Sequence, residues 1–334
     1  MTTKVGFIGA GGIAGAHMPN VDARDDTEIT AICDINESTA QDVAEQFDAT
    51  PYTDYKAMLG AEDLDAAYVC LPPAAHGTIE MDLVEAGLPF MIEKPIHLDL
   101  EQAVSVAKAV EDNNLVTCVG YQARYAPQTD KTVSYVAEHP ATLVEGWFVG
   151  GMPGTAWWRQ KDISGGQAVE QTTHIFDLSR RIVGDVESVC AYGSTGAMGD
   201  IENYDIEDAS IALLKFESGA VGHICSACVL NDGGMRQVGL KIHGRDYSVD
   251  YTYSSLALDS ADEEWDEDYS GALGPAMKEL DWTFLEAAET GDGSEIRCDY
   301  GEGLKSLALC LAVNRSMETG ESVSPAEMLA EAGM

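Results

Sequence analysis

A short apolar segment followed at once by a glycine-rich turn is the feature that most limits the folds open to this chain. Lys4 to Ile8 have the character of a buried strand, and Gly9-Ala-Gly11-Gly12-Ile13-Ala14 follows directly. This matches the G-x-G-x-x-G/A turn between a first strand and a helix, whose backbone N–H groups meet a pyrophosphate. The pattern predicts an α/β domain in which Gly9, Gly11, Gly12 and Ile13 lie at a dinucleotide.

An acidic residue at the end of the next apolar run strengthens this interpretation, because glycine-rich turns are common and one alone is weak. Ile29 to Cys33 form the second apolar run, and Asp34 ends it. A carboxylate there accepts hydrogen bonds from a ribose hydroxyl pair and repels a 2′-phosphate. Since no Arg follows within several residues, the sequence predicts NAD and disfavours NADP.

The first 122 residues continue as alternating strand and helix patterns. Further strands are expected at 66–71, 90–92 and 115–119, and helices at 38–47, 76–86 and 101–112. Such alternation predicts a doubly wound parallel sheet, with its ligand beyond the carboxyl ends of the strands. Pro19 is expected to kink the first helix or end it early.

Glu93-Lys94-Pro95 directly follows the strand expected at 90–92. A lysine at such a strand end points its ammonium group into the ligand crevice. A surface lysine in a turn is the alternative, and position alone does not decide between them. Pro95 is a candidate for a cis peptide bond.

Strand patterns dominate much of the second half, residues 123–334. They occur at 188–192, 209–216, 221–227 and 238–242, with little helical periodicity between Val183 and Gly274. This predicts a second, sheet-rich domain, in which His223 and His243 are structural. The acidic segment 262–268 is expected to be a solvated loop, since it lacks the spacing and glycine of a calcium loop.

The segment 170–180 carries a second group of polar residues at helical spacing. One continuous helix would place Glu170, His174 and Asp177 on the same face. The other face is apolar, with Ile175, Phe176, Leu178 and Ile182. The solvated side of an amphipathic helix is the alternative for the polar face. The glycine pair at 165–166 favours a site, because it lets a loop approach a ligand closely.

The charge balance excludes several partners. The chain has 334 residues, with 57 Asp or Glu against 19 Lys or Arg, a formal charge of −38. Nucleic acids and anionic membrane surfaces need clustered basic residues, so neither is expected. The hydrophobic content of 45% is ample for two cores, which excludes disorder as the explanation. We therefore expect a protein adapted to high salt.

The cysteines and the amino terminus bear on redox state and localisation. The eight Cys mostly stand singly among apolar residues and are expected to be free thiols. Cys225 and Cys228 lack the further ligands of a zinc site, so no metal is expected. Neither a signal peptide nor an apolar run near 18 residues is present, which predicts a cytoplasmic protein.

Together, these motifs resemble the Gfo/Idh/MocA oxidoreductase family. The likeness includes the glycine-rich turn, Leu71-Pro72 with His76, the Glu93-Lys94-Pro95 segment and Glu170 to Asp177, and it extends over nearly the whole chain. The resemblance implies a Rossmann domain, at 1–122, and an α+β domain with a large open, mostly antiparallel sheet, at 123–334. It also implies an NAD(P)-dependent dehydrogenase acting on CH–OH groups, and a homodimer or homotetramer formed through that sheet.

The resemblance also assigns site residues. Lys94 and His174 match the family's catalytic lysine and histidine, and Asp177 its second acid. Glu170 stands where the first Asp usually is, and is expected to support His174. Further cofactor contacts are implied for Leu71, Pro72, His76, Glu93 and Lys94. Pro73 replaces a common Asn, and a solvent-facing histidine at a helix start is the alternative for His76.

These residue types suit the oxidation of a secondary alcohol. His174, with a reference pKa near 6.5, can take the hydroxyl proton, and a carboxylate would orient its ring. Lys94 can hydrogen-bond the reacting oxygen. Asp177 is expected to bind a second substrate hydroxyl or to support His174. The expected substrate wall is Tyr121, Arg124, Trp158 and Arg159, although Trp and Tyr are more often core residues.

The leading prediction is an NAD-dependent dehydrogenase of a sugar or cyclitol. Three alternatives stay open at this point: the reverse reduction of a carbonyl or imine, an NAD-dependent glycosidase, and a non-catalytic NAD-binding regulator. Lys94, Glu170 and His174 together favour an enzyme, because a regulator needs no base.

Overall fold

The computed structural model describes residues 2–152, 154–230 and 234–334. The chain forms two compact units. Unit 1 comprises Met1–Ile96, Ser105–Gln122 and Met277–Gly303, and unit 2 comprises His97–Val104, Ala123–Ala276 and Leu304–Met334. One change of unit falls at the predicted boundary after residue 122. The prediction of two consecutive segments, 1–122 and 123–334, does not include the return of Met277–Gly303 to unit 1.

Unit 1 contains a six-stranded parallel sheet in the order β3-β2-β1-β4-β5-β6, which confirms the doubly wound fold. Its strands are β1 Thr3–Ile8, β2 Thr27–Cys33, β3 Thr50–Tyr52, β4 Ala66–Val69, β5 Phe90–Ile92 and β6 Thr117–Val119. The helices wholly within unit 1 are α1 Ala14–Asp22, α2 Glu37–Phe47, α3 Tyr55–Ala61 and α4 Thr78–Glu85, with a 3-10 turn at Pro73–Ala75. Helices α5 Leu100–Asp112, α10 Leu273–Thr290 and α11 Tyr300–Thr319 have residues in both units.

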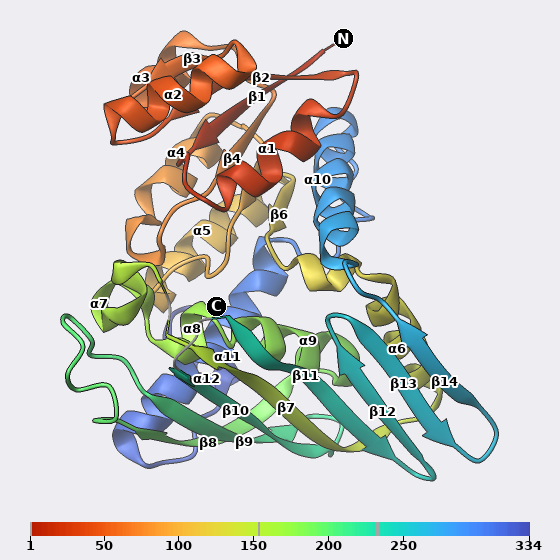
Figure 1. The fold of residues 1–334 in the computed structure, drawn as a ribbon. Helices are drawn as coiled ribbons and strands as arrows, with labels where there is room; N and C mark the ends of the chain where they lie inside the picture. The colour runs from red at the N-terminus through yellow and green to blue at the C-terminus, as the bar shows by residue number, and fades with distance from the viewer. Residues whose placement is uncertain (1, 153, 231–233) are drawn as a thin grey trace. The chain divides into compact units, whose positions relative to one another are not determined.

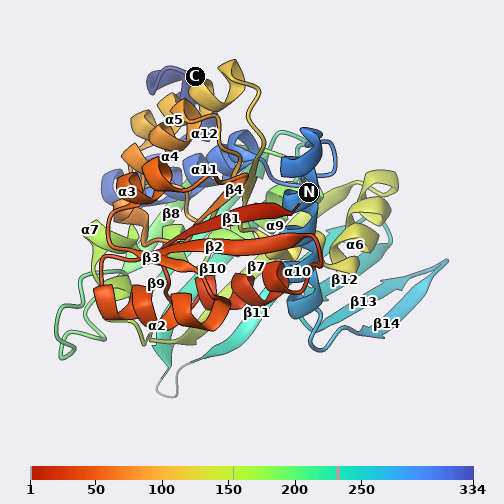
Figure 2. The same ribbon diagram turned by 90° about the horizontal axis from the view of Figure 1, so that it is seen from above.

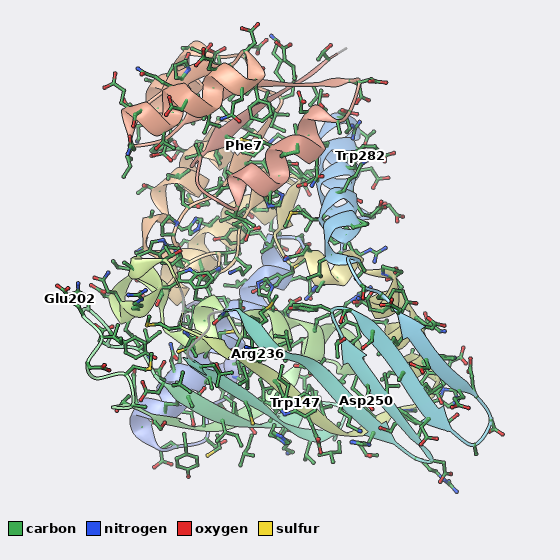
Figure 3. All side chains as sticks on the ribbon, viewed as in Figure 1. Phe7, Trp147, Glu202, Arg236, Asp250 and Trp282 are labelled. Atoms are coloured by element: carbon green, nitrogen blue, oxygen red, sulfur yellow. The ribbon has the colours of Figure 1, made fainter. Side chains whose placement is uncertain are left out.

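Aromatic packing joins the sheet of unit 1 to α10. Phe7 stacks on Tyr68 with ring centroids 4.6 Å apart, and Tyr68 meets Phe284 edge-on at 5.4 Å. Trp282 donates its indole N–H to the carbonyl of Asn20 at 2.9 Å. Figures 1 and 2 show α10 beside α1, and Figure 3 labels Phe7 and Trp282. This packing explains why a segment so late in the sequence belongs to unit 1.

Pro19 does not end the first helix early, so that part of the prediction is wrong. Helix α1 continues through Pro19 to Asp22. Pro19 and Gly15 are both exposed. The carbonyl of Gly15, whose usual partner is the missing N–H of Pro19, can therefore face water.

Unit 2 is built on an eight-stranded sheet in the order β14-β13-β12-β11-β7-β10-β9-β8, as predicted for a large, mostly antiparallel sheet. Only the pairing of β7 with β10 is parallel among its strand pairs. The strands are β7 Ala141–Gly151, β8 Val186–Ser194, β9 Ala209–Phe216, β10 Val221–Leu230, β11 Met235–Gly244, β12 Tyr247–Thr252, β13 Ser255–Ser260 and β14 Glu264–Asp268. The helices wholly within unit 2 are α6 Pro127–Glu138, α7 Lys161–Ser164, α8 Gln167–Glu170, α9 Thr173–Val183 and α12 Pro325–Glu331, with a 3-10 turn at Ala156–Arg159. A further 3-10 turn, Gln122–Tyr125, spans the change from unit 1 to unit 2.

The acidic segment 262–268 is mostly a strand, so the predicted loop is wrong there. Glu264–Asp268 pairs with β13, and its residues alternate between exposed and half-buried. Trp265 packs on Tyr135 with ring centroids 5.1 Å apart, and the Lys131 ammonium lies 3.9 Å from the Trp265 ring centre. One aromatic anchor and a cation thus hold an otherwise solvated acidic strand.

The two faces of the unit 2 sheet differ. A Cβ added to Gly146 of β7 would lie 3.0 Å from Ile175 of α9, so the Gly146 side faces helices. Trp147 points to the opposite side and pairs across the strands with Cys225, Ile211 and Tyr192. We call this side the outer face, defined by Leu143, Trp147, Tyr192, Ile211, Leu213 and Val221.

Three simpler predictions concern thiols, membranes and metals. All eight cysteines are free, as predicted. No helix among the described residues is long and apolar enough to cross a membrane. Within the same residues, no group of three or more His, Cys, Asp or Glu could hold a metal ion.

Candidate functional site

The glycine-rich turn has the geometry that a dinucleotide needs. Gly9 has φ +93°, and a Cβ on it would lie 2.2 Å from the carbonyl oxygen of Cys70. Gly11 and Gly12 are exposed, with open space where a Cβ would stand. Helix α1 begins just beyond, and Ile13 gives it no side-chain cap. Backbone N–H groups at this helix start are therefore available to an anion such as a pyrophosphate.

Asp34 lies at the carboxyl end of β2, as predicted. Its Oδ2 accepts a hydrogen bond from the Ala10 N–H at 3.0 Å, and its Oδ1 accepts one from the Asn36 N–H at 2.8 Å. These bonds hold a half-buried carboxylate next to the turn. Strands β1 and β4 form the point where the strand order reverses, which is where such sheets bind ligands. The residues fit NAD, which would supply a hydride acceptor at this edge.

The loop after β4 contains Leu71, Pro72 and His76. Leu71 packs beside the turn, 3.0 Å from a Cβ placed on Gly9. His76 is buried, with Nδ1 2.6 Å from the Glu80 carboxylate, so the solvent-facing alternative is wrong. Its Nε2 has no hydrogen-bond partner among the described residues. Burial raises the pKa of Glu80, but the charge of His76 and the Gly77 N–H outweigh it and hold that pKa below its usual value.

The Glu93-Lys94-Pro95 segment follows β5 on the same sheet edge. The Lys94-Pro95 peptide bond is cis, as the sequence suggested. Glu93 is buried, whereas Lys94 is half-buried. The backbone N–H of Lys94 donates to Glu93 Oε2 at 3.1 Å. The turn thus presents a lysine side chain at the ligand edge of unit 1.

In unit 2, residues 170–180 do not form one continuous helix, so that prediction is wrong. Glu170 ends α8, and α9 begins at Thr173. The Thr172 hydroxyl donates to Ser226 of β10 at 2.7 Å, and this bond pins the break between the helices. Glu170 is buried at the end of α8, and His174 is half-buried in the first turn of α9. The apolar face of α9 is buried as predicted.

Asp177 and Arg124 form a buried ion pair. Arg124 Nε lies 2.8 Å from Asp177 Oδ2 and its Nη2 lies 2.7 Å from Oδ1. The Ser306 hydroxyl also donates to Asp177 Oδ1 at 2.7 Å. Both residues are at most 2% exposed. Their burial and mutual pairing favour a structural role, so neither enters the reaction proposed below.

The remaining residues of the expected substrate wall differ in exposure. Trp158 and Arg159 lie half-buried in the 3-10 turn Ala156–Arg159. The Trp158 indole N–H is buried and has no acceptor within the described part of the chain. Tyr121 is only 2% exposed and belongs to unit 1. Trp158 thus carries a buried donor that no described residue satisfies.

The residues packed against the glycine pair at 165–166 require glycine at both positions. Both residues have positive φ, +77° and +88°. A Cβ on Gly165 would lie 2.7 Å from Leu98, and one on Gly166 would lie 2.7 Å from Glu207. Asn314 of α11 donates to the Gly165 carbonyl at 2.7 Å. The pair therefore fixes the start of α8, which carries Glu170.

Two segments of the chain match models of one protein family. Residues 3–121 match the "Oxidoreductase family, NAD-binding Rossmann fold", and residues 140–250 match the "GFO/IDH/MocA C-terminal domain". The chain belongs to the Gfo/Idh/MocA family. It is accordingly an oxidoreductase with an NAD-binding Rossmann domain, as the motifs predicted.

Among curated proteins, this family member is 27% identical to "Uncharacterized oxidoreductase YrbE" of Bacillus subtilis, covering 97% of each chain. It is 24% identical to "Myo-inositol 2-dehydrogenase" of Thermotoga maritima, covering 98% of this chain and 99% of the relative. A solved structure of "Levoglucosan dehydrogenase, complex with NADH" has a TM-score of 0.85 at 21% identity, covering 97% of this chain and 99% of the other. The structural likeness supports the Gfo/Idh/MocA fold.

Sequence reasoning missed two buried charged residues of unit 1, His17 and Asp281. Both His17 nitrogens have carboxylate partners, Asp281 at 2.7 Å and Glu93 at 3.1 Å. A signal was present for His17, since Ala14, Met18 and His17 occupy the buried face of α1. A histidine on the buried face of a helix needs a buried hydrogen-bond partner. Nothing local indicated Asp281, which lies 264 residues away.

Proposed function

We propose that the protein oxidises a secondary alcohol of a sugar or cyclitol and transfers the hydride to NAD. The observation that carries this proposal is the placement of Lys94 at the end of β5, on the sheet edge whose glycine turn and Asp34 fit the cofactor. Unit 2 adds a half-buried histidine, His174, in the first turn of α9, and a buried carboxylate, Glu170.

The residues divide the chemistry as follows. His174 takes the proton of the substrate hydroxyl, for which an imidazole is suited near neutral pH. Glu170 orients the ring of His174 and stabilises its charged form. The role proposed for Lys94 is to donate a hydrogen bond to the reacting oxygen and to stabilise the negative charge that develops on it. Bound NAD supplies the acceptor for the hydride.

A polyhydroxylated substrate is supported by the relatives' names and by Trp158. Relatives are named for levoglucosan, for D-glucosides and for myo-inositol. The Trp158 ring offers an apolar surface for a C–H face, and its buried indole N–H can donate to a hydroxyl. We extend the sugar and cyclitol class to this chain on that basis.

Absorbance at 340 nm separates this function from its alternatives. The enzyme is incubated with NAD and a panel of polyols that includes myo-inositol, levoglucosan and glucosides. A net rise in NADH supports the dehydrogenase. Glycoside cleavage without net NADH indicates the transient oxidation of a glycosidase, and bound NAD without turnover indicates a regulator. If a ketone or imine oxidises NADH, and no polyol reduces NAD, the protein is a reductase.

We further propose that the protein is a homodimer or homotetramer formed through the outer face. Leu213, Val221 and Tyr192 are 51%, 52% and 61% exposed on a chain that otherwise carries a large excess of acidic residues. Several large apolar side chains exposed on one face of a sheet are typical of an interface. A symmetric pair of sheets would bury it on both copies.

Replacing Leu213 by Glu is expected to convert the oligomer to a monomer, because two carboxylates would be desolvated at each symmetric contact. Analytical ultracentrifugation measures the change. Ile35→Glu is the matched control, since Ile35 is 96% exposed on unit 1 and lies outside the outer face. A wild-type protein that sediments as a monomer would contradict the proposal.

We also propose that the protein is adapted to high salt and works in the cytoplasm. With a charge of −38, self-repulsion opposes the folded state when screening is weak. Raising salt from about 0.1 M to about 1 M shortens the screening length from about 10 Å to about 3 Å. The melting temperature is therefore expected to rise across a KCl series, and equal stability at low salt would refute the adaptation.

A further inference from the structure

Three buried, charged side chains from distant segments meet inside unit 1. They are His17 of α1, Glu93 at the end of β5, and Asp281 of α10, and none is more than 4% exposed. His17 Nδ1 lies 2.7 Å from Asp281 Oδ1, and His17 Nε2 lies 3.1 Å from Glu93 Oε1. Asn20 donates to the second oxygen of Asp281 at 2.8 Å. The proposed reaction gives His17 and Asp281 no chemical step.

The charge state of His17 follows from its partners. Burial alone lowers the pKa of a histidine, but Asp281 and Glu93 outweigh it and raise the pKa of His17 to about 10. At neutral pH both ring nitrogens therefore carry a proton, and each donates to a carboxylate. Buried charges are costly unless they are paired in good geometry. This cost makes the relative placement of α1, β5 and α10 strict.

Glu93 is held on both of its oxygens. Oε1 receives the His17 N–H, and Oε2 receives the backbone N–H of Lys94 at 3.1 Å. A Cβ on Gly120 would lie 2.3 Å from Oε1, so a glycine there leaves room for the carboxylate. The Glu93 N–H also donates to the Val69 carbonyl at 2.9 Å. The Glu93 carboxylate thus links His17 to the backbone of the lysine that follows it.

We propose that His17 is a positioning residue for Lys94. It fixes Glu93, and through Glu93 it fixes the turn that presents the Lys94 ammonium group. Because His17 lies on the helix whose start fits the pyrophosphate, it also ties the cofactor helix to that turn. The inference rests on the proposed role of Lys94. Its rival is that the three charged groups satisfy one another and only stabilise the fold.

Two amide substitutions of His17 separate these possibilities. The amide nitrogen of Asn lies near the position of Nδ1, and that of Gln lies near the position of Nε2. His17→Asn can keep the bond to Asp281 and loses the one to Glu93, whereas His17→Gln keeps the bond to Glu93. Both variants remove the same buried cation, so a merely structural role predicts similar effects.

Hydrogen exchange at the Lys94 amide and turnover provide the readouts. We expect His17→Asn to speed exchange in peptides that contain Lys94 and to lower kcat on the order of 10²-fold, as displaced catalytic groups do. The KM for the polyol and the Kd for NADH should change little. His17→Gln should stay close to wild type in both readouts. Equal effects of the two variants, or none with Asn, would overturn the proposal.

Gly120→Ala provides a second route if the His17 variants fail to fold. The added methyl group displaces Glu93 Oε1 and leaves every charge in place. We expect the same faster exchange at Lys94 and the same loss in kcat, and wild-type values would overturn the proposal. If no polyol is oxidised by the wild type, the proposed function fails, but the exchange at Lys94 still decides the role of His17.

Discussion

Replacing Lys94 by Ala is expected to lower kcat for polyol oxidation on the order of 10² to 10³-fold, the cost of removing one preorganised donor to a developing oxyanion. The Kd for NADH should stay within a few fold, because the glycine turn and Asp34 hold the rest of the cofactor. Steady-state rates at 340 nm and a fluorescence titration with NADH measure the two quantities. The loss should appear in kcat because the hydrogen bond from Lys94 strengthens as negative charge develops on the substrate oxygen.

Lys108→Ala is the matched control for this variant, since Lys108 is an exposed lysine of α5. It should turn over at the wild-type rate. A Lys94→Ala enzyme with wild-type kcat would mean that Lys94 is an ordinary turn residue. The site assignment in unit 1 would then be wrong, although the fit of the glycine turn to NAD would stand.

Replacing His174 by Ala is expected to lower kcat by about 10² to 10⁴-fold, the range that a positioned general base contributes. The pH profile separates this role from a structural one. A base must be neutral, so wild-type kcat should fall as the pH drops through the pKa of the group in the enzyme complex. In His174→Ala this acidic limb should disappear, and residual activity should rise at high pH where hydroxide replaces the base.

His139→Ala is the control for the histidine variant, because His139 is exposed at the end of α6. Its kcat and pH profile should match wild type. If His174→Ala retains the acidic limb, another group supplies the base. Glu170 would then be the first residue to test, with Glu170→Gln as the isosteric change.

The parallel sheet could be predicted because its strands are short apolar runs that follow one another with helices between. Strand β14 could not, because its residues Glu-Trp-Asp-Glu-Asp carry a single apolar side chain, whose packing partner Tyr135 lies far away in the sequence. The helix break after Glu170 was missed for a similar reason. The bond from Thr172 to Ser226 that pins it is a tertiary contact.

In the candidate site, too, residues next to a recognisable strand could be predicted, whereas contacts between residues far apart in the chain could not. The glycine turn, Asp34 and Lys94 were found because each directly follows an apolar strand. Helical spacing and the family resemblance both point to Asp177 as a site residue, but neither indicates its buried ion pair with Arg124, which lies 53 residues earlier in the chain. The His17 and Asp281 contact joins residues 264 positions apart, so no periodicity could reveal it.

The most direct test of the central claim is whether the protein forms NADH from NAD and a polyol, with the product identified. We expect one NADH for each ketone formed from a sugar or cyclitol secondary alcohol, at a rate that Lys94→Ala and His174→Ala each reduce by at least about 10²-fold. NAD that binds tightly, with no NADH formed from any member of the panel, would contradict it.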